Sequence, residues 1–326
     1  MAGNLAGTTH EVPTVPGRRE PVLWGLVGNT PIIPLEPQDA LASAGPALLL
    51  KAEWLNPGGS VKDRPAREIL RSGFAMGMLP ERRLLDSSSG NTAAAYAMLG
   101  AAAGIRVTVC VPANSSRARR NQLRLLGAEV IETDPLEGSD GAIRRAQEIA
   151  AADPSRYWYA DQYNNPANPR AHERATGPEI WRASRGRITH LVAGVGTSGT
   201  LVGAGRFLKG RHPDIRLVAV QPESPLHGLE GLKHLATAIV PGIYDPSLVD
   251  ETVFVATEAA EAKIRQLARE RGLFVGWSTG AALVAAEAVL ARAVAQRGGP
   301  PPVVVAIAPD GGSSYLADER RLLEEP

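Results

Sequence analysis

The chain has 326 residues, of which 44% are hydrophobic and 21% charged, and its formal net charge is +1. This length exceeds one ordinary core and predicts two domains or lobes of a folded globular protein. The near-neutral charge excludes a strong field that would attract nucleic acid or anionic lipid. No run reaches the roughly 18 apolar residues of a membrane span, and residues 1–20 lack the apolar core of a signal peptide. We therefore expect a cytoplasmic protein with neither nucleic-acid nor membrane partners.

Short β-branched runs alternate along the chain with stretches rich in alanine and leucine. This alternation predicts an α/β fold with two open, mostly parallel twisted sheets flanked by helices. Helices are expected to begin at Asn91 or Thr92, at Ser116 and at Thr279, because these side chains can cap a helix N-terminus. The expected strands are 47–54, 83–87, 106–112, 129–133, 189–193, 215–220, 252–256 and 303–308.

Lys62 lies in the sequence Asn-Pro-Gly-Gly-Ser-Val-Lys-Asp-Arg at 56–64, a glycine turn that leads into a helix. Only five of the 35 lysines and arginines are lysine. A lysine amine, unlike a guanidinium, can lose its proton and form a Schiff base with an aldehyde. The alternative is an ordinary solvated lysine at the start of a helix.

Three further loops rich in small residues lie where a strand meets a helix. The segment 87–92, Ser-Ser-Ser-Gly-Asn-Thr, favours an anion site made by backbone N–H groups, such as one for a substrate carboxylate. The glycines of 194–200 match GxGxxG, and Glu223 follows at the distance expected for a dinucleotide site. The hydroxyl groups among those glycines suit a phosphate monoester better. The turn 276–280 is, by itself, only a capping motif.

The single cysteine and the histidines indicate no further chemistry. Cys110 lies in an expected buried strand, which is typical of a structural thiol. The six histidines show no metal-ligand spacing, so we expect no metal site.

Taken together, these loops resemble those of the cysteine synthase and cystathionine β-synthase family, which are pyridoxal-phosphate (PLP) enzymes of fold type II. The resemblance runs from Gly28 to about Leu316, and six motifs occur in the family's order. The motifs are Asn-Pro-Gly-Gly-Ser-Val-Lys-Asp-Arg at 56–64, Ser-Ser-Gly-Asn-Thr at 88–92, Gln162 with Asn-Pro-Ala-Asn-Pro at 165–169, Thr-Gly-Pro-Glu at 176–179, Gly-Val-Gly-Thr-Ser-Gly-Thr at 194–200 and Gly-Trp-Ser-Thr-Gly at 276–280.

The resemblance implies a role for each site residue. Lys62 would join PLP as a Schiff base and move the substrate α-proton. Asn91 would hydrogen-bond the cofactor's 3′ oxygen, and Ser278 would face the pyridine nitrogen. The cofactor phosphate would bind Gly196, Thr197, Ser198, Gly199 and Thr200, although the family usually has glycine at 198. The substrate would bind Ser88, Ser89, Gly90, Thr92 and Gln162 through its carboxylate, with Gly231 near its amine.

The implied activity is L-cysteine synthesis by β-replacement on O-acetylserine or O-phosphoserine, with sulfide or another sulfur donor, through an α-aminoacrylate. A neutral Ser278 hydroxyl cannot keep the ring nitrogen protonated as a carboxylate does, which disfavours transamination. Alternatives are a cystathionine β-synthase activity, a serine/threonine dehydratase and, on the GxGxxG pattern, an NAD-dependent oxidoreductase. His227, Lys233 and His234 could receive an anionic leaving group or simply solvate their loop.

The resemblance also implies a division into lobes, with the active site between them. Residues 47–158 would form a small mobile lobe that carries Lys62 and the carboxylate loop. Residues 1–46 and 159–326 would form a large lobe that holds the phosphate and the ring nitrogen. The segment 23–35 is expected to cross between lobes or subunits of a homodimer. An acetyltransferase or a sulfur-carrier protein is a further expected partner.

Overall fold

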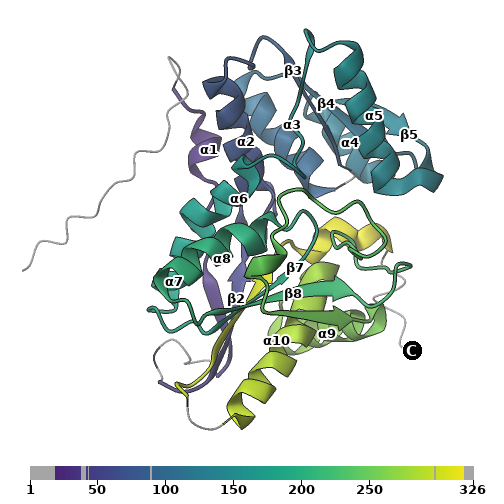
Figure 1. Ribbon diagram of the computed structural model, residues 1–326. Coiled ribbons are helices and arrows are strands. Elements are labelled where there is room, and N and C mark those ends of the chain that lie inside the picture. Colours follow the sequence, from purple (N-terminus) through teal and green to yellow (C-terminus); the bar gives the residue numbers. More distant parts are fainter. Residues whose placement is uncertain (1–18, 38–41, 43, 89, 297–298, 319–326) are drawn as a thin grey trace, which may run out of the picture.

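The computed structural model describes residues 19–37, 42, 44–88, 90–296 and 299–318. Two sheets divide this part of the chain into two lobes (Figure 1). The strands are β1 (Ile32–Glu36), β2 (Ala47–Ala52), β3 (Arg83–Ser87), β4 (Val107–Pro112), β5 (Glu129–Thr133), β6 (Tyr157–Tyr159), β7 (His190–Gly194), β8 (Arg216–Pro222), β9 (Glu251–Val255) and β10 (Val303–Ala308). The helices are α1 (Val22–Gly25), α2 (Asp63–Ala75), α3 (Asn91–Ala103), α4 (Arg117–Leu125), α5 (Gly138–Ala152), α6 (Ala167–Ala171), α7 (Gly177–Ala183), α8 (Gly199–Arg211), α9 (Thr257–Arg271) and α10 (Trp277–Ala295).

The six-stranded sheet has the order β1-β2-β10-β7-β8-β9, and the four-stranded sheet has the order β5-β4-β3-β6. Every pair of neighbours is parallel except β1 and β2. The prediction of two open, mostly parallel sheets flanked by helices is confirmed.

Helices cover both faces of the six-stranded sheet. Along β2, Leu48 and Leu50 belong to the core beneath α9 and α10, whereas Ala47 and Leu49 belong to the core beneath α7 and α8. Figure 1 shows α8 and α10 on opposite sides of this sheet. Burial on both faces explains why these strands are continuous apolar runs in the sequence.

The four-stranded sheet is also covered on both faces. Val107 and Val109 pack with α3 on one face, and Leu85 and Cys110 pack with α5 on the other. Burial raises the pKa of the Cys110 thiol to about 12, so it stays protonated and acts as a small apolar side chain. The interpretation of Cys110 as a structural thiol is consistent with this position.

The segment before β2 connects the two lobes. Trp24 in α1 is buried in the core of the four-stranded lobe, and its Nε1 donates to the carbonyl of Leu99 (3.0 Å). β1 then pairs with β2 at the edge of the six-stranded sheet. Residues 23–35 therefore contact both the core of the smaller sheet and the edge of the larger one, which is consistent with the expected crossing.

The boundary of the small lobe differs from the expectation. β2 was assigned to the small lobe but pairs with β1 and β10, so residues 47–52 belong to the six-stranded sheet. Residues 157–159 form β6 and pair with β3, which extends the four-stranded sheet to Tyr159. The first strand of the smaller sheet is therefore β3, and the turn that carries Lys62 connects the two sheets.

The helix α10 is long and apolar enough to be a membrane-span candidate by composition, which the sequence reading did not expect. It packs against β10, β7 and α9 within one hydrophobic core. Half of its most apolar stretch is buried within the protein. This contact pattern is that of a core helix.

Candidate active site

Lys62 precedes the first residue of α2 and follows a tight turn. Gly58 N–H donates to Asp63 Oδ2 (2.5 Å), and a Cβ on Gly58 would lie 2.4 Å from Asp63 Oδ1. Gly59 has a φ of 81°, which favours glycine. Burial lowers the pKa of the Lys62 amine, and the Asp310 carboxylate offsets part of this shift. The amine is therefore more readily neutral than an exposed lysine, as formation of a Schiff base requires.

The loop after β3 meets Gln162 beside the start of α3. Thr92 Oγ1 donates to Gln162 Oε1 (2.7 Å), and Gln162 Nε2 donates to the carbonyl of Ser87 (2.8 Å). Ser88 Oγ accepts from the N–H of Gly90 (3.2 Å). The structure thus brings together Ser88, Gly90, Thr92 and Gln162, whereas Ser89 lies outside the described residues.

The expected side-chain caps of two helices are wrong. Gly90 is the N-cap of α3, and the Asn91 and Thr92 side chains turn away to Asp310 and Gln162. The helix α10 begins at Trp277 after the N-cap Gly276, so Thr279 lies inside its first turn. The Asn91 and Thr92 side chains thus contact other loops of the site, whereas Thr279 Oγ1 has no hydrogen-bond partner among the described residues. Ser116 does occupy the N-cap position of α4, as expected, but its side chain makes no capping hydrogen bond.

Asp86 lies beneath the loop after β3 and was missed by the sequence analysis. It accepts hydrogen bonds from the N–H of Ser87 (2.8 Å) and the N–H of Gln162 (3.2 Å). Burial raises the pKa of this carboxyl to about 7, although these two hydrogen bonds oppose the shift. Asp86 therefore fixes the backbone at Gln162 through the hydrogen bond to its N–H.

The loop between β7 and α8 is closely packed at its glycines. A Cβ on Gly196 would lie 2.4 Å from the carbonyl oxygen of Gly231, and a Cβ on Gly199 would lie 1.9 Å from Asn168 Oδ1. Ser198 has a φ of 71°, a conformation that glycine adopts at less cost, which is consistent with the family's usual glycine here. The loop therefore accepts no larger residue at 196 or 199 without displacing its neighbours.

Two side chains outside this loop hold its hydroxyl groups. Asn168 Nδ2 donates to Thr197 Oγ1 (3.1 Å) and to the carbonyl of Gln162 (2.8 Å), so it joins the loop after β7 to the segment that carries Gln162. His172 Nε2 lies 3.3 Å from Thr200 Oγ1. Burial lowers the pKa of His172 to about 3, so the ring is neutral. The sequence signal for Asn168 was the Asn-Pro-Ala-Asn-Pro segment, but nothing in the sequence singled out His172.

Ser278 is 4% exposed in the first turn of α10. The preceding Gly276 N–H donates to the carbonyl of Asp310 (3.1 Å). A Cβ on Gly276 would lie 2.0 Å from Asp310 Oδ1, so only glycine allows this close approach. Asp310 is a second residue that the sequence analysis missed, because it lies more than 30 residues away along the chain.

The three residues of the loop 222–241 that could have received an anionic leaving group already have partners. Lys233 is 8% exposed, forms an ion pair with Asp140 (3.1 Å) and lies 4.9 Å from the ring centre of Tyr163. His227 Nδ1 accepts from the N–H of Leu229 (3.1 Å), and His234 Nδ1 lies 2.9 Å from Thr237 Oγ1. These contacts favour the structural interpretation of all three side chains.

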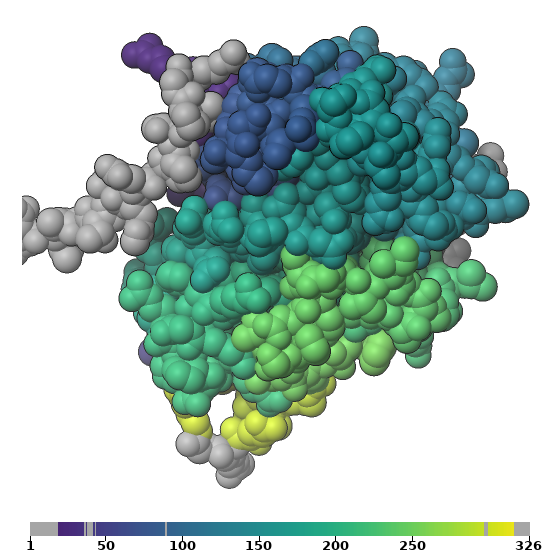
Figure 2. Space-filling view, turned by 45° about the horizontal axis from the view of Figure 1, so that its top comes forward, coloured from purple at the N-terminus to yellow at the C-terminus, as the bar shows by residue number. Residues whose placement is uncertain are grey.

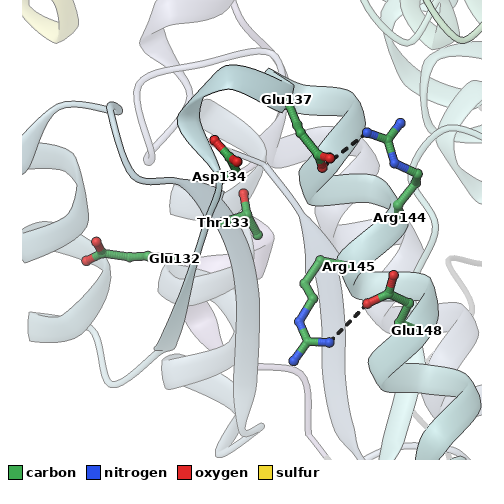
Figure 3. Close-up of a pocket in the computed structure, with 8 residues that line it drawn as sticks. Glu132, Thr133, Asp134, Glu137, Arg144, Arg145 and Glu148 are labelled. Atoms are coloured by element: carbon green, nitrogen blue, oxygen red, sulfur yellow. Dashed lines mark hydrogen bonds and ion pairs between the residues drawn. The ribbon is translucent and has the colours of Figure 1, made fainter.

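A surface groove of about 340 Å³ lies beside β5 and α5, away from these loops (Figure 3). It shares no residue with the site described above. Its two arginines are paired, Arg144 with Glu137 (3.1 Å) and Arg145 with Glu148 (3.0 Å). The groove therefore supplies no unpaired cation for a ligand. Within the part of the chain that the structure describes, no three His, Cys, Asp or Glu side chains converge as in a metal site.

The site fits a cofactor phosphate. The Ser198 Oγ is buried without a hydrogen-bond partner at the start of α8, where a helix N-terminus favours an anion. A buried hydroxyl without a partner is costly, and a phosphate oxygen would satisfy it. The glycines around it leave no room for side chains but keep the backbone close to a ligand.

Comparison with known proteins gives the same result. The chain is 47% identical over 302 residues to a cysteine synthase of Aquifex aeolicus, with 91% of each protein covered. It superposes with a TM-score of 0.83 and 28% identity on the crystal structure of a cysteine synthase from Entamoeba histolytica, covering 100% of this chain and 94% of that one. The crystal structure of an O-acetylserine dependent cystathionine β-synthase from Helicobacter pylori superposes with a TM-score of 0.79 and 33% identity. The match covers 90% of this chain and 96% of that one.

The family of pyridoxal-phosphate dependent enzymes matches residues 23–310, which include every candidate site loop. This match replaces the dinucleotide interpretation of the glycines at 194–199. The chain therefore belongs to the family of pyridoxal-phosphate dependent enzymes.

Proposed function

We propose that the chain is a cysteine synthase, which uses PLP to make L-cysteine from an activated serine and a sulfur donor. The observation that carries this proposal is the 47% identity to a cysteine synthase over nine-tenths of both proteins. The position of Lys62 supports it, because its buried amine has a lowered pKa. Cytoplasmic location and a homodimeric state remain expectations from the sequence.

Each loop has a role in binding the cofactor. The backbone N–H groups and hydroxyls of 196–200 would hold the phosphate, Asn91 the 3′ oxygen, and Ser278 the ring nitrogen. When bound, PLP supplies an electron-withdrawing ring that makes the α-proton of an amino acid removable. Ser278 is a neutral hydroxyl, so it stabilises charge on the ring less than a carboxylate would.

The chain's own residues then handle the substrate. The backbone N–H groups of 88–92, together with Thr92 and Gln162, would hold its carboxylate. The neutral Lys62 amine would take the α-proton while the β-substituent leaves, and would return a proton to the same carbon after the sulfur has added. We infer that carboxylate binding draws the four-stranded lobe onto the six-stranded lobe and excludes water.

The sulfur donor has a second candidate, homocysteine. The similar structure from Helicobacter pylori is described as an O-acetylserine dependent cystathionine β-synthase. Cystathionine formation is therefore the alternative for this chain, with the same first half-reaction.

The test is product analysis with purified protein loaded with PLP. O-acetylserine and O-phosphoserine are each supplied with sulfide or with homocysteine, and Lys62→Ala serves as the control. We expect cysteine from at least one ester with sulfide, and none from Lys62→Ala. Cystathionine as the dominant product would favour the alternative, and pyruvate without any thiol product would contradict both.

A further inference from the structure

The loop that follows β10 holds two parts of the proposed cofactor site together. Val61 N–H donates to the carbonyl of Pro309 (2.7 Å), which fixes the turn before Lys62. Gly276 N–H donates to the carbonyl of Asp310 (3.1 Å), which fixes the turn before Ser278. The backbone of residues 309–310 is therefore bonded both to the turn before Lys62 and to the turn before Ser278.

The side chain of Asp310 reaches a third part of the site, in the other lobe. It is 2% exposed, and its Oδ2 accepts from Asn91 Nδ2 (2.6 Å) and from the Tyr315 hydroxyl. The Asn91 Oδ1 accepts from Arg119 Nη1 (3.2 Å). A guanidinium can only donate and a carboxylate can only accept, so these two partners fix which way the amide faces. One N–H of the Asn91 amide remains for another acceptor.

We propose that Asp310 is a positioning residue for the reaction: it orients the Asn91 amide toward the cofactor's 3′ oxygen and places a buried negative charge beside the Lys62 turn. This inference rests on the proposed function. Asp310 lies in the large lobe and acts through the Asn91 side chain of the small lobe.

The charges around Asp310 decide how far it influences the amine. Lys62 and Arg119 face it as cations, and Tyr315 donates to it, while Glu230 lies near Tyr315. Burial raises the pKa of Asp310, and its hydrogen bonds and Lys62 offset part of this shift. The carboxylate in turn favours the charged form of Lys62 against the effect of burial. Removing the carboxylate charge should therefore make the amine lose its proton more easily.

Asp310→Asn separates charge from shape, because an asparagine oxygen can still accept from Asn91. The measurement is reductive methylation of the full-length chain freed of PLP, at a series of pH values, followed by peptide mass mapping. Lys263 of α9, whose side chain is partly exposed and paired with Glu287, serves as the internal reference in each digest. We expect the midpoint of Lys62 labelling to move to lower pH in Asp310→Asn, while that of Lys263 stays in place.

Tyr315→Phe is the matched control, since it removes a hydrogen bond from Asp310 but keeps the charge and the bond to Asn91. It should not move the Lys62 midpoint to lower pH. Equilibrium dialysis of PLP tests the orienting role. Asp310→Ala should bind PLP about tenfold more weakly, the loss of one hydrogen bond, and Asp310→Asn within about threefold of the parent.

An unchanged Lys62 midpoint in Asp310→Asn, or parental PLP affinity in Asp310→Ala, would overturn the inference. If Asp310→Ala does not fold, the labelling of Asp310→Asn still decides. Failure of the proposed function gives a different result, because the parent chain itself would then bind no PLP at Lys62.

Discussion

Arg64 and Glu179 form a buried bidentate ion pair: Arg64 Nη1 lies 2.8 Å from Glu179 Oε1, and Nη2 lies 2.7 Å from Oε2. Arg64 also bonds Glu53 through Nε (2.6 Å), and Lys51 Nζ bonds Glu179 (2.6 Å). Burial would raise the pKa of Glu179, but Arg64 and Lys51 lower it to about 2. Two cations and two anions thus join β2, α2 and α7, and one of them, Arg64, lies two residues after Lys62.

Arg64→Met should destabilise the protein by about 3–5 kcal/mol, because it leaves Glu53 and Glu179 buried with one cation between them. Urea unfolding followed by circular dichroism measures the change. Arg145→Met is the control, since its pair with Glu148 is more than half exposed and should be worth at most about 1 kcal/mol. Equal losses in the two variants would contradict the structural role of the buried network.

Gly199 and Gly210 both lie in α8 and provide a test variant and its control for the phosphate loop. Gly199→Ala places a Cβ 1.9 Å from Asn168 Oδ1 and so displaces the partner of Thr197. We expect PLP affinity to fall about tenfold or more, as for the loss of one hydrogen bond to a charged group. A Cβ on Gly210 meets nothing within 4 Å, so Gly210→Ala should keep the affinity and add about 0.5–1 kcal/mol of stability. Unchanged PLP affinity in Gly199→Ala would show that this loop does not hold the phosphate.

The sequence predicted those parts of the fold that have a local signal. Continuous apolar runs identified most strands, and glycine turns identified the loops. The two strands that it missed have weak patterns: β1 is an edge strand interrupted by Pro34, and β6 has only three residues. The cap expected at Asn91 or Thr92 failed because these two side chains bond to distant residues.

The same reason explains which site residues were missed. Asp310 and Asn91 are separated by 219 positions, and Asp86 bonds Gln162 across 76. No spacing rule connects residues that far apart. Lys62 was found because a glycine turn, a helix start and a rare residue type coincide within nine positions.

Asp86→Asn should change how stability depends on pH. The folded protein raises the pKa of Asp86 from 3.8 to about 7, so the folded state binds this proton more tightly than the unfolded chain. Stability from this group is therefore present below pH 3.8 and lost as pH rises to about 7, by up to about 4 kcal/mol for three pKa units. Asp86→Asn lacks this titrating group, so its free energy of unfolding should not show this part of the loss. Relative to the parent, the variant should therefore gain stability as pH rises from 4 to 7.

Urea unfolding at pH steps measures that difference. Asp214→Asn, whose side chain is 92% exposed, should follow the parent curve. If Asp86→Asn also follows the parent curve, Asp86 does not titrate as its burial implies.

Lys233 and Asp140 connect the loop 222–241 to α5 of the four-stranded lobe. In Figure 2 the blue-green residues of that lobe lie directly against the green segment that contains this loop. Lys233→Met and Asp140→Asn should lower kcat/KM about two- to tenfold, and by the same factor for O-acetylserine and O-phosphoserine, because the lost contact is between lobes. The double variant should lose little more than either single one. Loss with O-phosphoserine alone would instead place Lys233 at the leaving group.

The central claim is that the Lys62 amine is the group that joins PLP. Borohydride reduction of the loaded protein, followed by peptide mass mapping, tests it directly. We predict one pyridoxyl label per chain, on Lys62, and no label after Lys62→Ala with the other four lysines intact. A label on Lys51, Lys209, Lys233 or Lys263, or no label at all, would contradict the account.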